Sequence, residues 1–196
     1  ASSSSVYGEN KKVPFETTDN VDHPISLYAA TKKSNELMAH TYGHLYGFKT
    51  TGLRFFTVYG PWGRPDMAYY LFAEAISNDK PIKLFNNGKM ERDFTYIDDI
   101  VNGVTKIIEK NIDSREHYKI YNIGNNKTIS LQVFIKTIET SLGKKAIKEM
   151  YPMQQGDVPK TFADISQLIK DYKYTPGIDI KSGVDDFVRW HKNYNL

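Results

Sequence analysis

Segments with the pattern of strands alternate along this chain with segments with the pattern of helices, and this alternation restricts the fold more than any other feature. The stretches 50–56 and 118–123 read as strands, the first of them rich in β-branched and aromatic residues. Apolar residues recur at helical spacing over 26–46, 97–110 and 130–142. Such alternation is typical of α/β domains, in which helices pack on a parallel sheet. We therefore predict an α/β fold.

Residues that favour caps and turns set the ends of the predicted elements. The Ser26 hydroxyl can cap the long helix, and Gly47 can end it. Residues 1–8 are predicted as a strand end and a hydroxyl-rich loop, and 50–56 as a buried strand. We also predict helices at 69–78, 166–172 and 180–194, and extended segments at 82–85, 93–97 and 147–151. Two helix faces are predicted to be apolar: Ala30, Leu37, Met38, Thr41, Tyr42 and Leu45 on the first, and Ile100, Val101, Val104, Ile107 and Ile108, directed inward, on the second.

Composition and charge argue against several classes of protein. The net charge is only +3, from 26 Lys and Arg against 23 Asp and Glu, with the two signs interspersed, which does not favour nucleic-acid binding. The chain has no Cys, so disulfides and Cys-ligated metals are excluded. The five His residues show no metal-ligand pattern, so no metal site is predicted. Because no apolar run approaches the ~18 residues of a membrane span, we expect a cytoplasmic protein without a membrane partner.

Tyr28 and Lys32 carry the clearest chemical signal. A spacing of four residues places both side chains on one face of a helix. A nearby cation favours the ionised form of a phenol, and the opening run of serines can add a hydroxyl. The three groups together suit proton transfer. The spacing alone fits a packed Tyr beside a surface Lys equally well, so the neighbouring segments decide between the two interpretations.

Those neighbouring segments form an ordered set. The serine run 1–8 precedes the Tyr/Lys helix, and Gly52-Leu53-Arg54-Phe55-Phe56-Thr57-Val58-Tyr59-Gly60-Pro61 follows it. Further matches are Arg92-Asp93-Phe94-Thr95-Tyr96-Ile97-Asp98-Asp99, Tyr121-Asn122-Ile123-Gly124 and Gly156-Asp157-Val158-Pro159. In this order they resemble the extended short-chain dehydrogenase/reductase family, in its nucleotide-sugar branch. The group that the chain resembles most is that of the UDP-glucuronate 4-epimerases.

The resemblance implies a division of the chain. Residues 1–62 would be the C-terminal part of a Rossmann-like, NAD-binding parallel sheet. Residues 63–196 would mainly form a smaller α/β domain that binds the nucleotide sugar, with about 93–125 packing back on the Rossmann-like part. The glycine-rich turn that holds the cofactor pyrophosphate is absent from the sequence, where Gly60-x-x-Gly63 is the nearest pattern. We therefore expect the chain to be the C-terminal portion of a longer enzyme and to be inactive by itself.

The resemblance also implies an NAD-dependent 4-epimerisation of a UDP-sugar through a 4-keto intermediate, with UDP-glucuronate converted to UDP-galacturonate. Tyr28, Lys32 and Ser3 would be catalytic, and these three together with Phe56 and Val58 would contact NAD. Related 4,6-dehydratases carry an Asp and a Glu where this chain has Ser4 and Ser5. Because a hydroxyl cannot act as a carboxylate base near neutral pH, elimination is disfavoured.

Residues that contact the UDP-sugar are implied in the same way: Ser4, Ser5, Thr57, Arg64, Leu84, Phe85, Arg92 and Asp157. Arg92 would grip the diphosphate and Asp157 the ribose, with Leu84 and Phe85 beside the uracil. Thr57 stands where hexose epimerases use Asn, and an Arg fork such as that of Arg64 suits a carboxylate. This combination favours a sugar with a 5-carboxylate.

Three further points stay open at this stage. The substrate could instead be UDP-glucose or UDP-N-acetylglucosamine, and the chain could be a non-catalytic nucleotide-binding or scaffolding module. In the family that the chain resembles, the Tyr/Lys helix packs against its copy in a second subunit. A homodimer is therefore expected.

Overall fold

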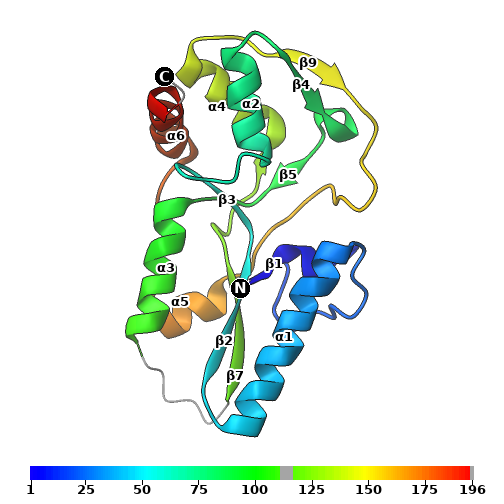
Figure 1. Ribbon diagram of the computed structural model, residues 1–196, viewed down its shortest axis with the longest axis vertical. Coiled ribbons are helices and arrows are strands. Elements are labelled where there is room, and N and C mark those ends of the chain that lie inside the picture. The colour runs from blue at the N-terminus through cyan, green and yellow to red at the C-terminus, as the bar shows by residue number, and fades with distance from the viewer. Residues whose placement is uncertain (111–116, 195–196) are drawn as a thin grey trace.

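The computed structural model describes residues 1–110 and 117–194 as an elongated molecule (Figure 1). Its lower part in that view holds a three-stranded parallel sheet in the order β1 (Ser2–Ser3), β2 (Thr50–Phe55) and β7 (Tyr118–Ile123). Ser3 pairs with Phe55, and Phe55 with Ile123, so the three strands end at one edge. The predicted α/β fold with parallel strands is confirmed.

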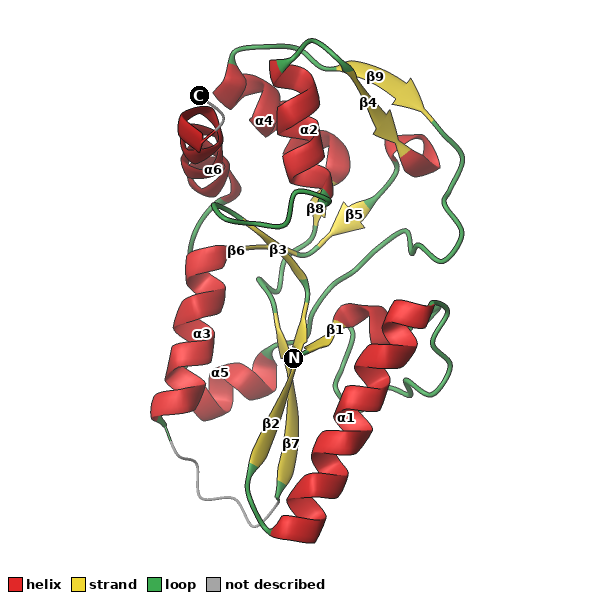
Figure 2. Cartoon of the chain, in the orientation of Figure 1, coloured by secondary structure: helices red, strands yellow, loops and turns green. Residues whose placement is uncertain are grey.

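Helices cover both faces of this sheet (Figure 2). Helix α1 (Leu27–Tyr46) lies along one face, and α3 (Ile97–Glu109) and α5 (Ser166–Tyr172) lie along the other. The core of this lower part is made of the following buried residues: Val6, Tyr7, Phe15, Val21, Phe56, Ile100, Tyr121, Ile123, Ala163, Ile165, Leu168, Tyr172 and Tyr174.

The upper part contains short strand pairs covered by helices. Its elements are β3 (Thr57–Tyr59), α2 (Ala68–Ser77), β4 (Pro81–Leu84), η2 (Phe85–Gly88), β5 (Glu91–Arg92), β6 (Phe94–Tyr96), β8 (Ile129–Ser130), α4 (Leu131–Leu142), β9 (Ile147–Met150) and α6 (Ile180–Tyr194). The pairs β3–β6 and β4–β9 are parallel, and β5–β8 is antiparallel. A second core lies under α2, α4 and α6, where the Phe94 and Phe134 rings stack with centroids 4.0 Å apart.

The lower core also takes residues from the second half of the chain. Tyr121 and Ile123 belong to it because β7 pairs with β2 along its whole length. Ala163, Leu168 and other residues of 163–174 belong to it as well, outside the predicted returning segment 93–125. The division into 1–62 and 63–196, with 93–125 returning to the first unit, stays a prediction.

The predicted helix ends are confirmed. The Ser26 hydroxyl oxygen accepts a hydrogen bond from the Ala29 N–H at 3.1 Å. Gly47 ends α1 in the left-handed conformation, with φ of 72°, and Gly143 ends α4 in the same way, with φ of 73°. Strand β7 and helices α5 and α6 occupy the predicted ranges. Capping chemistry is local, which explains why these positions can be predicted from the sequence.

Burial is where the sequence pattern and the structure differ. Only Arg54 of β2 is buried, although 50–56 has the pattern of a buried strand. Val101 and Ile108 of α3 are 54% and 77% exposed rather than inward-facing. The sequence pattern identifies apolar residues that are able to be buried. Whether they are buried depends on which distant segments pack over them. The expected loop also contains a short 3-10 helix, η1 (Ser4–Tyr7).

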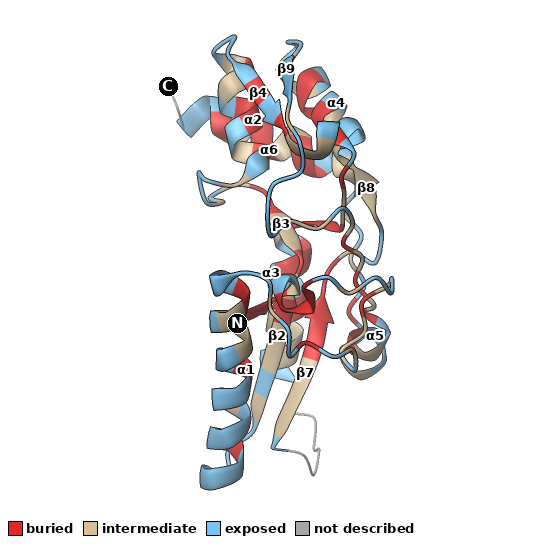
Figure 3. Cartoon of the chain, turned by 90° about the vertical axis from the view of Figure 1, so that its right-hand side faces the viewer, coloured by how far each residue is buried: buried red, intermediate tan, exposed pale blue. Residues whose placement is uncertain are grey.

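The predicted apolar face of α1 is exposed, as Figure 3 shows for most of that helix. Its large side chains are more than half exposed: Leu37, Met38, Tyr42 and Leu45. Helix α1 instead turns Ala29, Glu36 and Gly43 inward. No described helix is long and apolar enough to cross a membrane.

Candidate active site

The edge where the three parallel strands end forms one wall of a cavity of about 570 Å³, which we call the reaction cavity. Ligands of open parallel sheets bind beyond the carboxyl ends of the strands. The residues that line it come from β1, η1, α1, the end of β2 with β3, the loop after β3 and α2: Ala1, Ser2, Ser3, Ser4, Ser5, Tyr28, Lys32, Phe55, Phe56, Thr57, Val58, Trp62, Gly63, Arg64, Met67 and Tyr69. The structure therefore brings together nine of the predicted site residues.

Tyr28 and Lys32 face this cavity from the first two turns of α1. The Lys32 ammonium nitrogen lies 5.7 Å from the centroid of the Tyr28 ring and donates a hydrogen bond to the Ala1 carbonyl oxygen at 3.3 Å. The Tyr28 side chain is 48% exposed, so its hydroxyl is open to a bound molecule. The spacing of four residues thus produces the predicted pair.

The serine run holds a fixed hydroxyl beside that pair. Ser3 is 8% exposed, and its hydroxyl oxygen accepts from the Ser5 N–H at 3.2 Å and donates to the Ser5 hydroxyl at 3.1 Å. No Asp or Glu of the described ranges lines the reaction cavity. The site therefore offers a phenol, an ammonium and hydroxyls, and lacks the carboxylate base that an elimination would use.

Tyr69 is a second phenol in the reaction cavity, but its environment differs. Burial raises the pKa of Tyr69 to about 12, against which the Arg64 charge acts in the opposite direction. A phenol that stays protonated near neutral pH is a poor general base. Tyr28 is the phenol better placed for proton transfer.

A smaller cavity of about 170 Å³, the connecting cavity, continues from the reaction cavity. The two share Ser4, Ser5 and Thr57. Arg92 and Asp157 also line it. Thr57 is at the centre of the whole site, because it also lines the third cavity described below.

Arg92 is held in a fixed orientation. Its guanidinium donates to the Asp157 carboxylate at 2.7 Å and to the carbonyl oxygens of Glu91 at 3.0 Å and Pro159 at 3.2 Å. Burial lowers the pKa of Arg92, and the Asp157 charge opposes that shift. The Arg92 side chain is only 15% exposed. The result is a pre-oriented cation in a partly desolvated cleft, a setting in which an arginine fork binds phosphate oxygens well.

The third cavity, of about 560 Å³, has mostly apolar walls and also reaches Arg92 and Asp157; we call it the apolar cavity. Phe85 lines it as predicted, with Ile82, Lys83 and Leu71. The Leu84 side chain is fully buried in the upper core and does not line the cavity, so its predicted place beside the uracil stays a prediction.

Arg64 lines the reaction cavity, and its guanidinium is engaged by the Asp66 carboxylate through two hydrogen bonds of 3.0 and 3.1 Å. Both side chains are about two thirds exposed. Exposed ion pairs contribute little, roughly 0.2–1 kcal/mol. Arg64 can therefore leave Asp66 when a better anion is present, and its contact with the substrate stays a prediction.

Seven residues of the reaction cavity were not predicted as site residues: Ala1, Ser2, Phe55, Trp62, Gly63, Met67 and Tyr69. Trp62 and Met67 line it from the segment that also carries Arg64. Trp62 adopts φ of 61°, a left-handed conformation that is unusual for an aromatic residue. The only sequence signal for Trp62 and Met67 is their position in a loop that follows a strand. Such loops lie at the carboxyl edge of the sheet, where binding sites form.

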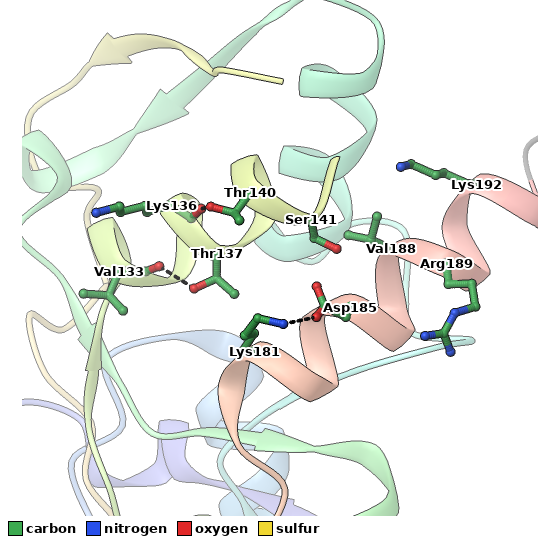
Figure 4. Close-up of a pocket in the computed structure, with 10 residues that line it drawn as sticks. All are labelled: Val133, Lys136, Thr137, Thr140, Ser141, Lys181, Asp185, Val188, Arg189 and Lys192. Atoms are coloured by element: carbon green, nitrogen blue, oxygen red, sulfur yellow. Dashed lines mark hydrogen bonds and ion pairs between the residues drawn. The ribbon is translucent and has the colours of Figure 1, made fainter. Parts of the chain in front are cut away.

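A separate hollow of about 690 Å³ lies between α4 and α6, away from all predicted site residues (Figure 4). Lys181 pairs there with Asp185 at 2.8 Å. Arg189 pairs with Asp186 at 2.7 Å. None of the predicted site residues lines this hollow, so we assign it no part in the site. Within the described ranges no group of three or more His, Asp or Glu side chains could hold a metal ion.

Comparison with known proteins places this site in a family. Residues 1–124 match the model of the NAD dependent epimerase/dehydratase family. The chain is 52% identical over 99% of its length to Protein CapI of Staphylococcus aureus, of which it covers 62%. It is 46% identical over 99% of its length to a probable UDP-glucuronate 4-epimerase of Rhizobium meliloti, again covering 62% of that protein.

A solved structure agrees with these relatives. The crystal structure of the UDP-glucuronic acid 4-epimerase of Bacillus cereus, in complex with UDP-glucuronic acid and NAD, superposes with a TM-score of 0.90 at 34% identity. The superposition covers 98% of this chain and 60% of that one. The chain therefore belongs to the NAD-dependent epimerase/dehydratase family, and the predicted family resemblance is confirmed. It spans about three fifths of the length of these relatives.

Proposed function

We propose that the protein to which this chain belongs is an NAD-dependent UDP-sugar 4-epimerase that interconverts UDP-glucuronate and UDP-galacturonate. The observation that carries the proposal is the set of three cavities that adjoin one another at Thr57. Tyr28, Lys32 and Ser3 line the first, Arg92 and Asp157 line the second and third, and the rest of the third is mostly apolar. The reactive groups suit a sugar, the arginine a diphosphate, and the apolar walls a uracil, which are the three parts of a UDP-sugar.

The residues of the reaction cavity fit the nicotinamide part of NAD. Phe56 and Val58 give the cavity an apolar wall beside the Tyr28 and Lys32 polar groups. An aromatic and aliphatic wall suits a flat ring, and an ammonium suits ribose hydroxyls as a hydrogen-bond donor. When bound, NAD⁺ would accept the C4 hydride of the sugar and later return it.

The chain's own groups then move the proton. The Tyr28 phenolate takes the proton of the sugar 4-hydroxyl while the C4–H bond breaks, so that a ketone forms at C4. Lys32 places its ammonium group beside the Tyr28 ring. Ser3 hydrogen-bonds the reacting oxygen and orients it. After the 4-keto sugar rotates, Tyr28 returns the proton to the same oxygen, and the hydrogen is restored on the other face of the ring.

The hydroxyls around Thr57 support a carboxylate on the sugar. Ser4, Ser5 and Thr57 meet where the reaction cavity and the connecting cavity join, and Arg64 lies at the reaction cavity. Hydroxyl groups can donate hydrogen bonds to a carboxylate. The relatives named above for UDP-glucuronate agree with this choice over UDP-glucose and UDP-N-acetylglucosamine.

Substrate preference tests this proposal. We expect the full-length enzyme to turn over UDP-glucuronate with a higher kcat/KM than UDP-glucose or UDP-N-acetylglucosamine. Arg64→Gln should lower kcat/KM for UDP-glucuronate about tenfold, as expected for losing one hydrogen bond to a charged group, and leave UDP-glucose nearly unaffected. Asp66→Asn is the matched control: it frees Arg64 and should not reduce the preference. A clear preference for a neutral sugar would contradict the carboxylate, while leaving the epimerase class intact.

The 196-residue chain alone should bind UDP without binding NAD tightly or turning over substrate. It contains the residues assigned to the nucleotide sugar, but no glycine-rich turn of the kind that binds a cofactor pyrophosphate. Calorimetric titrations with UDP and with NAD, together with an epimerase assay, measure this. Tight NAD binding or turnover by the chain alone would refute the prediction. A chain that bound neither ligand would favour a scaffolding role.

We also propose that the full-length protein is a cytoplasmic homodimer. The exposed apolar side chains of α1, among them Leu37, Met38 and Tyr42, support a second packing surface on that helix. Light scattering of the full-length protein should give twice the subunit mass, and a monomer at micromolar concentration would argue against the dimer.

A further inference from the structure

A buried polar network ties the reactive helix to the sheet. Glu36 lies on α1 one turn beyond Lys32 and two turns beyond Tyr28, on the same side, and is 7% exposed. Its carboxylate accepts hydrogen bonds from the Ser2 hydroxyl at 2.6 Å and from the Arg54 guanidinium at 2.8 and 3.0 Å. Ser2 directly precedes Ser3. The network therefore contacts both the helix that carries Tyr28 and Lys32 and the strand that carries Ser3.

Arg54 connects Glu36 to the strands of the sheet. It is 3% exposed and pairs in register with Ser2 on β1 and with Asn122 on β7. Its guanidinium lies over the Tyr7 ring, 4.8 Å from the centroid, and the Tyr7 hydroxyl donates to the Asn122 amide oxygen at 2.6 Å. One guanidinium therefore contacts Glu36 of α1, the Tyr7 ring of η1 and, at 3.4 Å, the Thr17 carbonyl oxygen.

Stability alone does not account for such a pair. A buried ion pair can often be replaced by apolar residues of similar volume without loss of stability, whereas removal of one partner is strongly destabilising. Neither Glu36 nor Arg54 lines any of the three cavities of the site. A direct contact with substrate or cofactor is therefore not their role. What the pair does fix is the position of α1 relative to β2, while the hydrogen bond from Ser2 to Glu36 ties α1 to β1.

We propose that Glu36, Arg54 and Ser2 form a positioning network that sets Tyr28 and Lys32 against Ser3. The proposal rests on the epimerase function above. Catalytic groups act only within a narrow geometry, and a displacement of about 1 Å can cost on the order of 100-fold in rate. Tyr28 is about half exposed, so few contacts of its own hold it in place. The hydrogen-bonded Glu36 carboxylate lies one turn beyond Lys32 and fixes the helix that carries both residues.

The test uses the full-length enzyme and three variants that differ in severity. Ser2→Ala removes one hydrogen bond and keeps the ion pair. Glu36→Gln removes the charge and keeps the shape. Glu36→Leu combined with Arg54→Met replaces the pair by apolar groups, so that folding is retained. Asp171→Asn is the control for Glu36→Gln, because Asp171 pairs with Lys119 at 2.6 Å between α5 and β7, outside the reaction cavity.

We expect kcat to fall at least about tenfold in Glu36→Gln and in the double variant, and less in Ser2→Ala, with KM for UDP-glucuronate nearly unchanged. Asp171→Asn should change neither. A lower melting temperature with unaltered kcat in all three variants would show a merely structural role and overturn the proposal.

A readout without turnover separates this proposal from the proposed function. Fluorotyrosine placed at position 28 reports its surroundings by ¹⁹F NMR. We expect its resonance to shift in Ser2→Ala and Glu36→Gln and to stay in place in Asp171→Asn. If the wild-type enzyme has no epimerase activity, the function fails, and the ¹⁹F shifts still decide whether the network positions Tyr28. Unchanged ¹⁹F resonances in every variant would overturn the network whatever the activity.

Discussion

Tyr28→Phe is expected to lower kcat on UDP-glucuronate by roughly 10²–10⁴-fold, the usual contribution of a positioned general acid or base. The substitution removes one oxygen and keeps the ring that lines the reaction cavity. Steady-state kinetics and calorimetry with UDP measure the two effects separately. UDP affinity should be nearly unchanged, because UDP contacts are assigned to Arg92, Asp157 and the apolar cavity.

Tyr46→Phe is the control for this variant. Tyr46 is the last residue of the same helix, is 66% exposed and lines none of the three cavities of the site, so loss of its hydroxyl should leave kcat intact. If Tyr28→Phe kept near-normal turnover, Tyr28 would not be the acid/base group. Equal losses in both variants would point to damage to the helix rather than to the chemistry.

Arg92→Met is expected to weaken UDP binding by about 10- to 100-fold, because a hydrogen bond to a charged group contributes roughly 1.5–3 kcal/mol and each 1.4 kcal/mol is tenfold in affinity. The pre-orientation of Arg92 by Asp157 and two carbonyl oxygens makes this loss larger than for a surface arginine. Arg92→Lys should fall in between, since it keeps the charge and loses the fork. Calorimetric titration with UDP measures all three proteins.

Arg189→Met serves as the control, because Arg189 is 71% exposed, paired with Asp186 on α6 and absent from all three cavities of the site. UDP affinity that is the same in Arg92→Met and in the wild-type protein would remove Arg92 from the diphosphate site. Arg92→Met and Tyr28→Phe together separate UDP binding from the chemical step.

Much of the fold and of the site can be predicted from local sequence. Ser26 and Gly47 mark the ends of α1 by capping, and a spacing of four places Tyr28 beside Lys32. The segments 118–123, 166–172 and 180–194 fold as predicted for the same reason: periodicity and end signals lie within each segment. Family resemblance adds Ser3, Phe56, Thr57, Val58, Arg92 and Asp157, all of which line the site.

The remainder depends on contacts between distant segments. The two- and three-residue strands β3, β5, β6 and β8 are too short to have a pattern of their own, and form because a partner lies beside them. Leu84 turns into the core while Phe85 reaches the cavity, and that choice depends on how β4 sits against β9. The pairing of Glu36 with Arg54 likewise joins a helix and a strand that only the fold brings together.

The fate of the hydrogen at C4 tests the central claim most directly. The full-length enzyme is supplied with UDP-glucuronate that carries deuterium at C4, and the UDP-galacturonate formed is analysed by mass spectrometry and NMR. If Tyr28 moves only the hydroxyl proton while the C4 hydrogen leaves and returns as hydride, the product keeps its deuterium at C4, with no net consumption of NAD. Loss of that deuterium to solvent, or failure to form any C4 epimer, would contradict the account.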